Sequence, residues 1–260
     1  IFNYMLTKNT IKQIQLLKTN KGRSQQGKYI IEGKRCVLTY INNNEDLIIL
    51  FMTKDFLTKN KELVKKWEND ILNIQIISNK IMKSISNAKS APGILGICNL
   101  KEPSILNFDS RKWLYLDQIS NPGNLGTLIR TAAWFNIKNI ALSKNSVDPY
   151  NSKVVRSAVG AHTYSNIHNN IDFDIFENHN YYAVGADQNS KASIEKINTN
   201  KKLIIVLGSE TTGISKPVKE KLNEIVSISK LGYGESLNVS AAGSILMYKL
   251  SKKQNGILPR

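Results

Sequence analysis

The chain has 260 residues, and 36 Lys and Arg against 20 Asp and Glu give it a formal net charge of +16. Hydrophobic residues make up 41% of it, which permits a packed core and excludes global disorder. No apolar run approaches the ~20 residues of a membrane span, and no secretory leader is recognisable. The two cysteines, Cys36 and Cys98, stand alone, which disfavours a disulfide framework and a cysteine-based zinc site. We therefore expect a reducing, cytoplasmic setting. Because the chain opens on Ile1, we expect the natural protein to begin before it.

The first hundred residues alternate short apolar strands with helical patterns. Strands are predicted at 28–32, 47–51, 74–77 and 93–98, and helices at 35–40, 61–67 and 81–85. This alternation predicts a small α/β domain over residues 1–100, followed by a linker at 101–111 that contains Pro103. The Asn-rich stretches at 42–44 and 166–170 are predicted to be surface loops.

A second strand–helix alternation fills the remaining chain. Strands are predicted at 112–117, 139–142, 181–185, 203–207 and 225–228, with helices at 125–135, 151–159, 216–222 and 237–250. Such a repeat is typical of a mostly parallel sheet. We therefore predict one α/β domain over residues 112–260.

The positive charge is denser in the first domain. Residues 1–100 hold 16 Lys and Arg against 7 Asp and Glu, a net of +9, whereas residues 101–260 hold 20 against 13, a net of +7. Such an excess favours a polyanionic partner, nucleic acid above all. A genome biased toward Lys, Asn and Ile would give a similar composition without any selection for binding.

Three polar loops follow predicted strands of the second domain, at 117–126, 207–213 and 228–236. Because parallel sheets bind ligands beyond the carboxyl ends of their strands, the three loops together predict one site. Each loop alone is also explained as an ordinary turn, and Ser236 as a helix N-cap. Neither the G-x-G-x-x-G nor the P-loop pattern of nucleotide-binding proteins is present. His162, His168 and His179 are scattered, so we expect no metal.

The same loops resemble a known family. Asn121 to Ala132 (NPGNLGTLIRTA), Leu207 to Gly213 (LGSETTG) and Ser236 to Ala242 (SLNVSAA) resemble, in order, the three motifs of the SpoU (TrmH-like) RNA methyltransferases. Residues 147–161 resemble the intermediate stretch of that family, and the whole match covers about residues 112–252. More loosely, residues 23–98 resemble the small substrate-binding domain that often precedes it.

The resemblance implies a fold, a reaction and an assembly. The fold is a SPOUT-type parallel sheet with a C-terminal deep trefoil knot, preceded by a small, ribosomal-protein-like α/β RNA-binding domain. The reaction is methyl transfer from S-adenosylmethionine, without a metal, to a ribose 2′-hydroxyl of structured RNA. The assembly is a homodimer with the active site near its interface.

The resemblance also implies site residues. By motif position the catalytic residues are Arg130, Asn124, Glu210, Ser236 and Asn238, and the cofactor contacts are Gly208, Ile228, Leu237 and Gly213. Arg23, Lys153 and Arg156 are predicted RNA contacts. One departure concerns the pocket: Ser229 and Lys230 stand where the family commonly has Pro-Met. That stretch mainly offers backbone groups, so we expect an altered pocket shape rather than lost activity.

Several alternatives remain open at this point. We expect large-subunit (23S-type) ribosomal RNA as the substrate, with transfer RNA as the alternative. A non-catalytic RNA-binding protein on the same scaffold, a base methyltransferase and a dinucleotide-dependent enzyme are the other candidates; the missing dinucleotide fingerprint disfavours the last.

Overall fold

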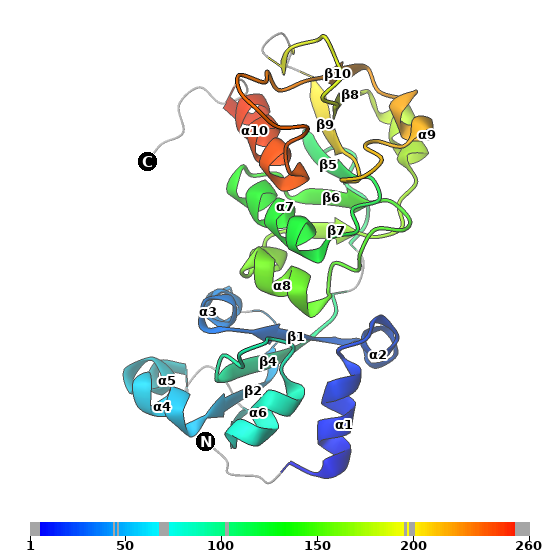
Figure 1. The fold of residues 1–260 in the computed structure, drawn as a ribbon. Helices are drawn as coiled ribbons and strands as arrows, with labels where there is room; N and C mark the ends of the chain where they lie inside the picture. Colours follow the sequence, from blue (N-terminus) through cyan, green and yellow to red (C-terminus); the bar gives the residue numbers. More distant parts are fainter. Residues whose placement is uncertain are drawn as a thin grey trace. The chain divides into compact units, whose positions relative to one another are not determined.

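A computed structural model describes residues 6–43, 45, 47–67, 73–101, 104–194, 197 and 201–252 (Figure 1). The chain divides into two compact units. Unit 1 comprises Ile1–Glu102 together with Tyr150–Thr163, and unit 2 comprises Pro103–Pro149 together with Tyr164–Arg260. The division near residue 102 lies close to the predicted linker. The segment 150–163, predicted to lie within the second domain, groups instead with the first.

Unit 1 is built on a mixed four-stranded sheet in the order β1 (Lys28–Glu32), β4 (Ile94–Asn99), β2 (Leu47–Thr53), β3 (Ile74–Ile77). β4 is antiparallel to both β1 and β2, and β3 is parallel to β2. The helices are α1 (Lys8–Leu16), α2 (Asn20–Gln26), α3 (Lys34–Asn42), α4 (Lys54–Lys59), α5 (Lys61–Trp67), α6 (Asn79–Ile85) and α8 (Ser152–Ala158), with a short 3-10 turn, η1 (Ala161–Thr163).

The two faces of this sheet carry separate cores. Tyr29 and Ile31 pack on one face with residues of α3 and α5, whereas Ile30 packs on the other with residues of α1 and α6. This alternation follows from the two-residue period of a strand. The predicted strand and helix at 74–77 and 61–67 are confirmed, while α1, α2 and α4 were not predicted.

Helix α8 completes the core on the α3 side. Its Val155 is fully buried in the same cluster as Cys36 and Tyr40. Just after it, Gly160 adopts a left-handed φ of +89°, and a Cβ there would lie 2.4 Å from the Cβ of Thr39. Only glycine allows so close an approach in that conformation. Val155 and Gly160 therefore anchor the segment from Tyr150 to Thr163 in the core of unit 1.

Unit 2 contains six parallel strands in the order β10 (Glu224–Val226), β8 (Tyr181–Ala186), β9 (Lys202–Leu207), β5 (Lys112–Leu116), β6 (Asn139–Leu142), β7 (Asn166–His168). Its helices are α7 (Pro122–Trp134), α9 (Lys216–Lys219) and α10 (Val239–Lys252), with a 3-10 helix, η2 (Phe173–His179). The predicted parallel α/β sheet is thus confirmed. The surface loop predicted at 166–170 is wrong for Asn166–His168, because edge pairing with β6 outweighs the low strand propensity of asparagine.

One face of the unit 2 sheet is aromatic and the other is covered by two helices. Trp113 and Tyr115 of β5 pack with Phe173 and Phe176 of η2. Helices α7 and α10 lie side by side over the opposite face, as Figure 1 shows. Among the described residues, no helix is long and apolar enough to cross a membrane.

Candidate functional site

The site begins where β5 ends and α7 starts. The side chain of Asn121 accepts hydrogen bonds from the backbone N–H groups of Gly123 and Asn124 (2.8 and 3.3 Å), and Pro122 occupies the first turn. Asparagine caps and first-turn prolines favour helix starts because they satisfy or remove unpaired N–H groups. The NPG segment is therefore a helix cap, and it leaves the side chain of Asn124 available for other contacts.

Asn124 joins the three predicted loops. Its amide nitrogen donates to Oε1 of Glu210, which follows β9, at 2.5 Å, and its Oδ1 accepts from Nδ2 of Asn238, which precedes α10, at 3.1 Å. Glu210 and Asn238, which lie 86 and 114 positions after Asn124 in the sequence, thus both contact its side chain. We call Asn124, Glu210 and Asn238 the three-loop junction. The predicted convergence of polar groups at the carboxyl edge of the sheet is present for these three residues.

The second loop turns tightly around two glycines. The backbone N–H of Gly213 donates to the carbonyl of Ser209 at 2.9 Å, and a Cβ on Gly208 would lie 2.1 Å from the carbonyl carbon of Gly213. Gly213 itself has a φ of +69°. Both glycines are required by the closure of this loop. The closure presents Glu210 to Asn124.

A buried carboxylate also holds the second loop. Asp117, which directly follows β5 and is 2% exposed, accepts a hydrogen bond from the backbone N–H of Ser215 at 2.7 Å through Oδ2. Its own N–H donates to the carbonyl of Leu207 at 2.8 Å. Asp117 was not among the predicted site residues. An acidic residue at the end of an otherwise apolar strand was the signal that could have found it.

The third loop has unused backbone groups. The backbone N–H and C=O groups from Ile228 to Leu237 make no hydrogen bond with any described residue. Leu237 is 53% exposed and Ile228 is half-buried. Ser236 lies two residues before Asn238, whose Oδ1 accepts from the N–H of Ser240 at 2.9 Å at the start of α10. The capping contact seen here therefore comes from Asn238 and not from Ser236.

Arg130 lies on a different face of α7 from the junction. Leu128 and Thr131 of α7 face Gly243 and Ser244 of α10, whereas Arg130 is exposed and has no hydrogen bond or ion pair with the described residues. Trp134, four residues on, shares its face and is 84% exposed. Within one chain, Arg130 is thus not part of the three-loop junction.

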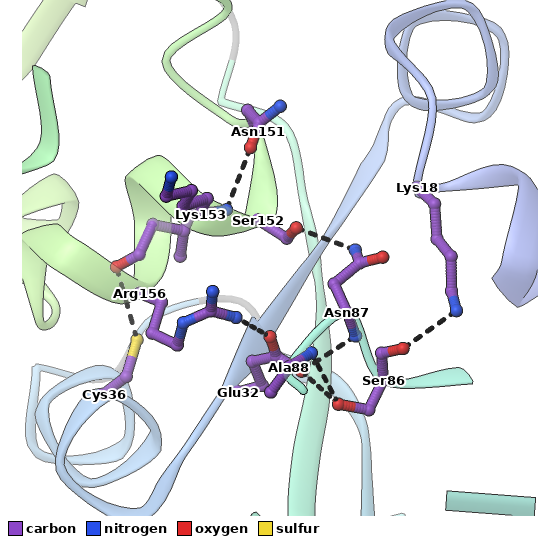
Figure 2. Close-up of polar contacts among 11 residues, drawn as sticks. Lys18, Glu32, Cys36, Ser86, Asn87, Ala88, Asn151, Ser152, Lys153 and Arg156 are labelled. Carbon is purple, nitrogen blue, oxygen red and sulfur yellow. Dashed lines mark hydrogen bonds and ion pairs between the residues drawn. The ribbon is translucent and has the colours of Figure 1, made fainter. Parts of the chain in front are cut away.

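The three predicted RNA contacts lie in unit 1 in unequal surroundings. Arg23 is 3% exposed and donates to the carbonyl of Leu17 at 2.9 Å, so its charge supports the α1–α2 turn and is not presented to solvent. Arg156 pairs with the buried carboxylate of Glu32 (Figure 2). Lys153 is exposed on α8. Of the three side chains, that of Lys153 is the most open to an RNA backbone.

The comparison with known families decides what the three loops belong to. The profile of the SpoU rRNA Methylase family matches residues 112–248, more than half of the chain, and all three loops lie within the match. This chain belongs to the SpoU rRNA methylase family. The resemblance expected from the sequence, and with it the class of RNA methyltransferase, is confirmed. Residues 8–96 match the MRM3-like substrate binding domain, which corresponds to most of unit 1.

Two relatives are similar over nearly the whole chain. The 23S rRNA (guanosine(2553)-2′-O)-methyltransferase RlmP of Bacillus subtilis is 26% identical over 92% of this chain and 95% of its own length. An uncharacterized tRNA/rRNA methyltransferase of Synechocystis is 25% identical over 94% of this chain and 91% of its own length.

Solved structures of this fold are also similar over the whole chain. The AdoMet-bound rRNA methyltransferase from Sinorhizobium meliloti has a TM-score of 0.79 at 19% identity and covers 97% of both chains. The SpoU methyltransferase AviRb from Streptomyces viridochromogenes, in complex with AdoMet, has a TM-score of 0.81 at 16% identity over 96% and 98%. At such identities the likeness establishes the fold, and it does so for both units.

Proposed function

We propose that this chain transfers a methyl group from S-adenosylmethionine to a ribose 2′-hydroxyl of ribosomal RNA. The observation that carries the proposal is the three-loop junction, in which Asn124, Glu210 and Asn238 meet at the carboxyl edge of the parallel sheet. That edge is where open α/β sheets bind their ligands. Family membership and the 2′-O-methyltransferase named among the relatives support the reaction type.

The third loop fits a cofactor held by backbone groups. Its backbone N–H and C=O groups from Ile228 to Leu237 have no partner within the described chain, and such groups form strong hydrogen bonds when a ligand is present. In this proposal Ile228, Leu237 and Gly208 hold S-adenosylmethionine, with Gly213 shaping the loop beside it. When bound, the cofactor supplies a methyl group already activated by its sulfonium charge.

The junction residues act by orienting groups. Glu210 fixes the amide of Asn124, which in turn fixes Asn238, so the three side chains keep one arrangement at the place where the ribose is to bind. Ser236, two residues before Asn238, offers a hydroxyl to the same place. Arg130 stabilises the negative charge that develops on the 2′-oxygen as its proton leaves. Because a guanidinium stays protonated in proteins, that proton passes to solvent and not to Arg130.

The position of Arg130 supports a homodimeric active site. Arg130 shares an exposed face of α7 with Trp134, and the neighbouring α10 exposes Ile245 and Tyr248 at 36% and 42%. Exposed aromatic and aliphatic residues on adjoining helices are typical of subunit interfaces. In the proposed homodimer this face is buried, and Arg130 of one copy completes the active site at the three-loop junction of the other copy.

We also propose a knotted topology for unit 2 and a cytoplasmic location for the protein. Over the C-terminal part of unit 2 we propose the deep trefoil knot of the SPOUT class, supported by family membership and by α10 packing back on α7 and β9. A cytoplasmic location is supported by the rRNA substrate and by two buried cysteines without a disulfide.

Ribosomal RNA is preferred to transfer RNA because the family profile and RlmP are named for it. The net charge of +16 suits either polyanion. The test is methyl transfer from labelled S-adenosylmethionine to in vitro transcripts of 23S rRNA and of tRNA, with digestion to nucleosides to locate the label. Label on a 2′-O-methylated nucleoside from 23S rRNA is expected.

The outcomes of this assay separate the alternatives. Label on a base would contradict the ribose assignment, and label in tRNA alone would contradict the rRNA assignment. Binding of RNA without uptake of the methyl donor would indicate a non-catalytic RNA-binding protein. Arg130→Ala is expected to lower the rate about a thousandfold, on the scale of losing one oxyanion-stabilising donor. Arg130→Lys, which keeps the charge but loses the planar fork, is expected to recover only part of the loss.

A further inference from the structure

A pocket lies in unit 2 at the opposite edge of the sheet from the three-loop junction. It has a volume of about 420 Å³, and its lining includes the first residues of β5, β6 and β7, namely Lys112, Asn139 and Asn166. All nine lining residues are polar or charged, and four of them are asparagines. A pocket lined by polar and charged residues favours a ligand that is itself polar or charged.

The charges in this pocket favour an anion. Its lining carries three cations, Arg111, Lys112 and Lys138, against one carboxylate, Asp109. Lys112 is half-buried, and its ammonium has no hydrogen bond or ion pair with the described residues. Burial, together with the adjacent Arg111, lowers the pKa of Lys112 below its usual value. A half-buried cation beside a second cation gains most from an anionic ligand.

An aromatic side chain adjoins the cations. Nζ of Lys138 lies 4.9 Å from the ring centroid of Tyr164, a residue that is 40% exposed. The hydroxyl of Tyr164 donates to Oδ1 of Asn136 at 2.5 Å, which fixes the ring at the rim of the pocket. Cations next to an exposed aromatic ring match single-stranded nucleic acid, in which each phosphate is accompanied by a base that can stack.

We propose that this pocket binds a phosphodiester group of the RNA substrate, with Lys112 and Lys138 on the phosphate and the ring of Tyr164 against the adjoining base. The proposal rests on the proposed function in taking RNA as the ligand, and adds a second RNA contact away from the methyl-transfer site. The five-residue strand β5 that separates the two edges is ~17 Å long, so a segment of several nucleotides reaches both.

The test compares two double variants of equal charge. Lys112→Gln with Lys138→Gln removes the pocket cations, whereas Lys191→Gln with Lys216→Gln removes two exposed cations elsewhere in unit 2. Affinity for a fluorescein-labelled single-stranded RNA is measured over a range of KCl concentrations, together with the affinity for S-adenosylmethionine and the melting temperature. The single variant Lys138→Gln, at an exposed position, covers the case in which the pocket double variant does not fold.

The pocket variant is expected to bind RNA about tenfold more weakly, with the slope of log affinity against log salt reduced by ~0.7 for one lost phosphate. The control pair should keep the full slope, and cofactor affinity should stay unchanged in both. Tyr164→Leu should weaken RNA binding without changing the affinity for inorganic phosphate. Equal RNA affinities and slopes for the two double variants would overturn the proposal.

Two further measurements distinguish an RNA phosphate from a small anion as the ligand, and separate this proposal from the proposed methyl transfer. If inorganic phosphate or a nucleoside monophosphate binds the wild type but not the pocket variant, while RNA affinity is the same in both, the pocket is a small-anion site and the RNA proposal is wrong. Methyl transfer is measured in parallel. A wild type that binds RNA through the pocket but methylates no ribose would contradict the proposed function and leave the pocket assignment intact.

Discussion

The guanidinium of Arg156 donates to the carboxylate of Glu32, 124 residues earlier in the chain, and that carboxylate is 1% exposed (Figure 2). The other oxygen of Glu32 accepts from the hydroxyl of Ser86 at 2.8 Å and from the N–H of Asn87 at 3.2 Å. The side chain of Asn87 in turn donates to Ser152 of α8 at 2.7 Å. The buried carboxylate of Glu32 thus links the end of β1 to α8, a helix that lies between β6 and β7 in the sequence.

Removal of this guanidinium is expected to destabilise unit 1. Arg156→Ala leaves a buried carboxylate with only neutral donors, which should lower the free energy of opening by about 2–4 kcal/mol. Adding Glu32→Gln removes the buried charge and should recover part of the loss. Hydrogen exchange in peptides from β1 and β4 measures the opening of this unit alone.

The exposed pair of Lys144 and Asp172 is the matched control for that experiment. The two side chains are 65% and 62% exposed, and Nζ of Lys144 lies 3.1 Å from Oδ2 of Asp172. Because the pair is solvated, Lys144→Ala should change the free energy of unfolding by no more than about 0.5 kcal/mol. Equal losses of stability for the Arg156 and Lys144 substitutions would contradict the prediction that the pair with the buried carboxylate stabilises the protein more than an exposed pair does.

Because unit 1 also includes residues 150–163, we predict that residues 1–102 alone do not fold stably. Such a fragment lacks α8, so it loses Val155 from the core and Arg156 from Glu32. Fusion of residues 150–163 to its C-terminus through a flexible Gly/Ser linker should restore a cooperative thermal transition in circular dichroism. A cooperative melt of the fragment alone, close to that of the fused form, would support the simpler division at residue 100.

The three-loop junction should be sensitive to one atom of Asn124. Asn124→Asp replaces the amide donor by an oxygen that faces the carboxylate of Glu210, so donation turns into repulsion. We expect kcat/KM for methyl transfer to fall about a hundredfold, or ~2.7 kcal/mol. Glu210→Gln keeps an acceptor oxygen and should cost about tenfold. Asn180→Asp, the same chemical change at an exposed left-handed residue, should leave the rate unaltered.

The two cysteines are expected to be inert in the folded protein. Both are buried in unit 1, and burial raises the pKa of the Cys36 thiol to about 12. The reactive thiolate is therefore scarce at pH 8. Titration with a thiol reagent such as DTNB should detect no cysteine in the native chain and two after denaturation. Rapid labelling of Cys36 under native conditions would contradict the packing of α3 against α8.

Much of the fold followed from local patterns. The periods of apolar residues predicted β3, β6 and α5 at the bounds observed, because strand and helix repeats place apolar side chains on one face. They did not predict α1, whose sequence KNTIKQIQL has few apolar residues, nor β7, whose three residues Asn166–His168 pair only because β6 lies beside them. Local propensity is a weak guide where a neighbouring element satisfies the backbone.

The sequence by itself determined the family and the residues that its motifs carry, because Asn124, Glu210 and Asn238 stand in short segments that resemble the motifs of the family and can be recognised without coordinates. Only the tertiary structure decided which of these residues touch, that Arg130 makes no hydrogen bond or ion pair with them, and that Arg156 is paired with Glu32. Contacts across more than eighty residues depend on how sheets and helices pack, and nothing in local spacing encodes that distance.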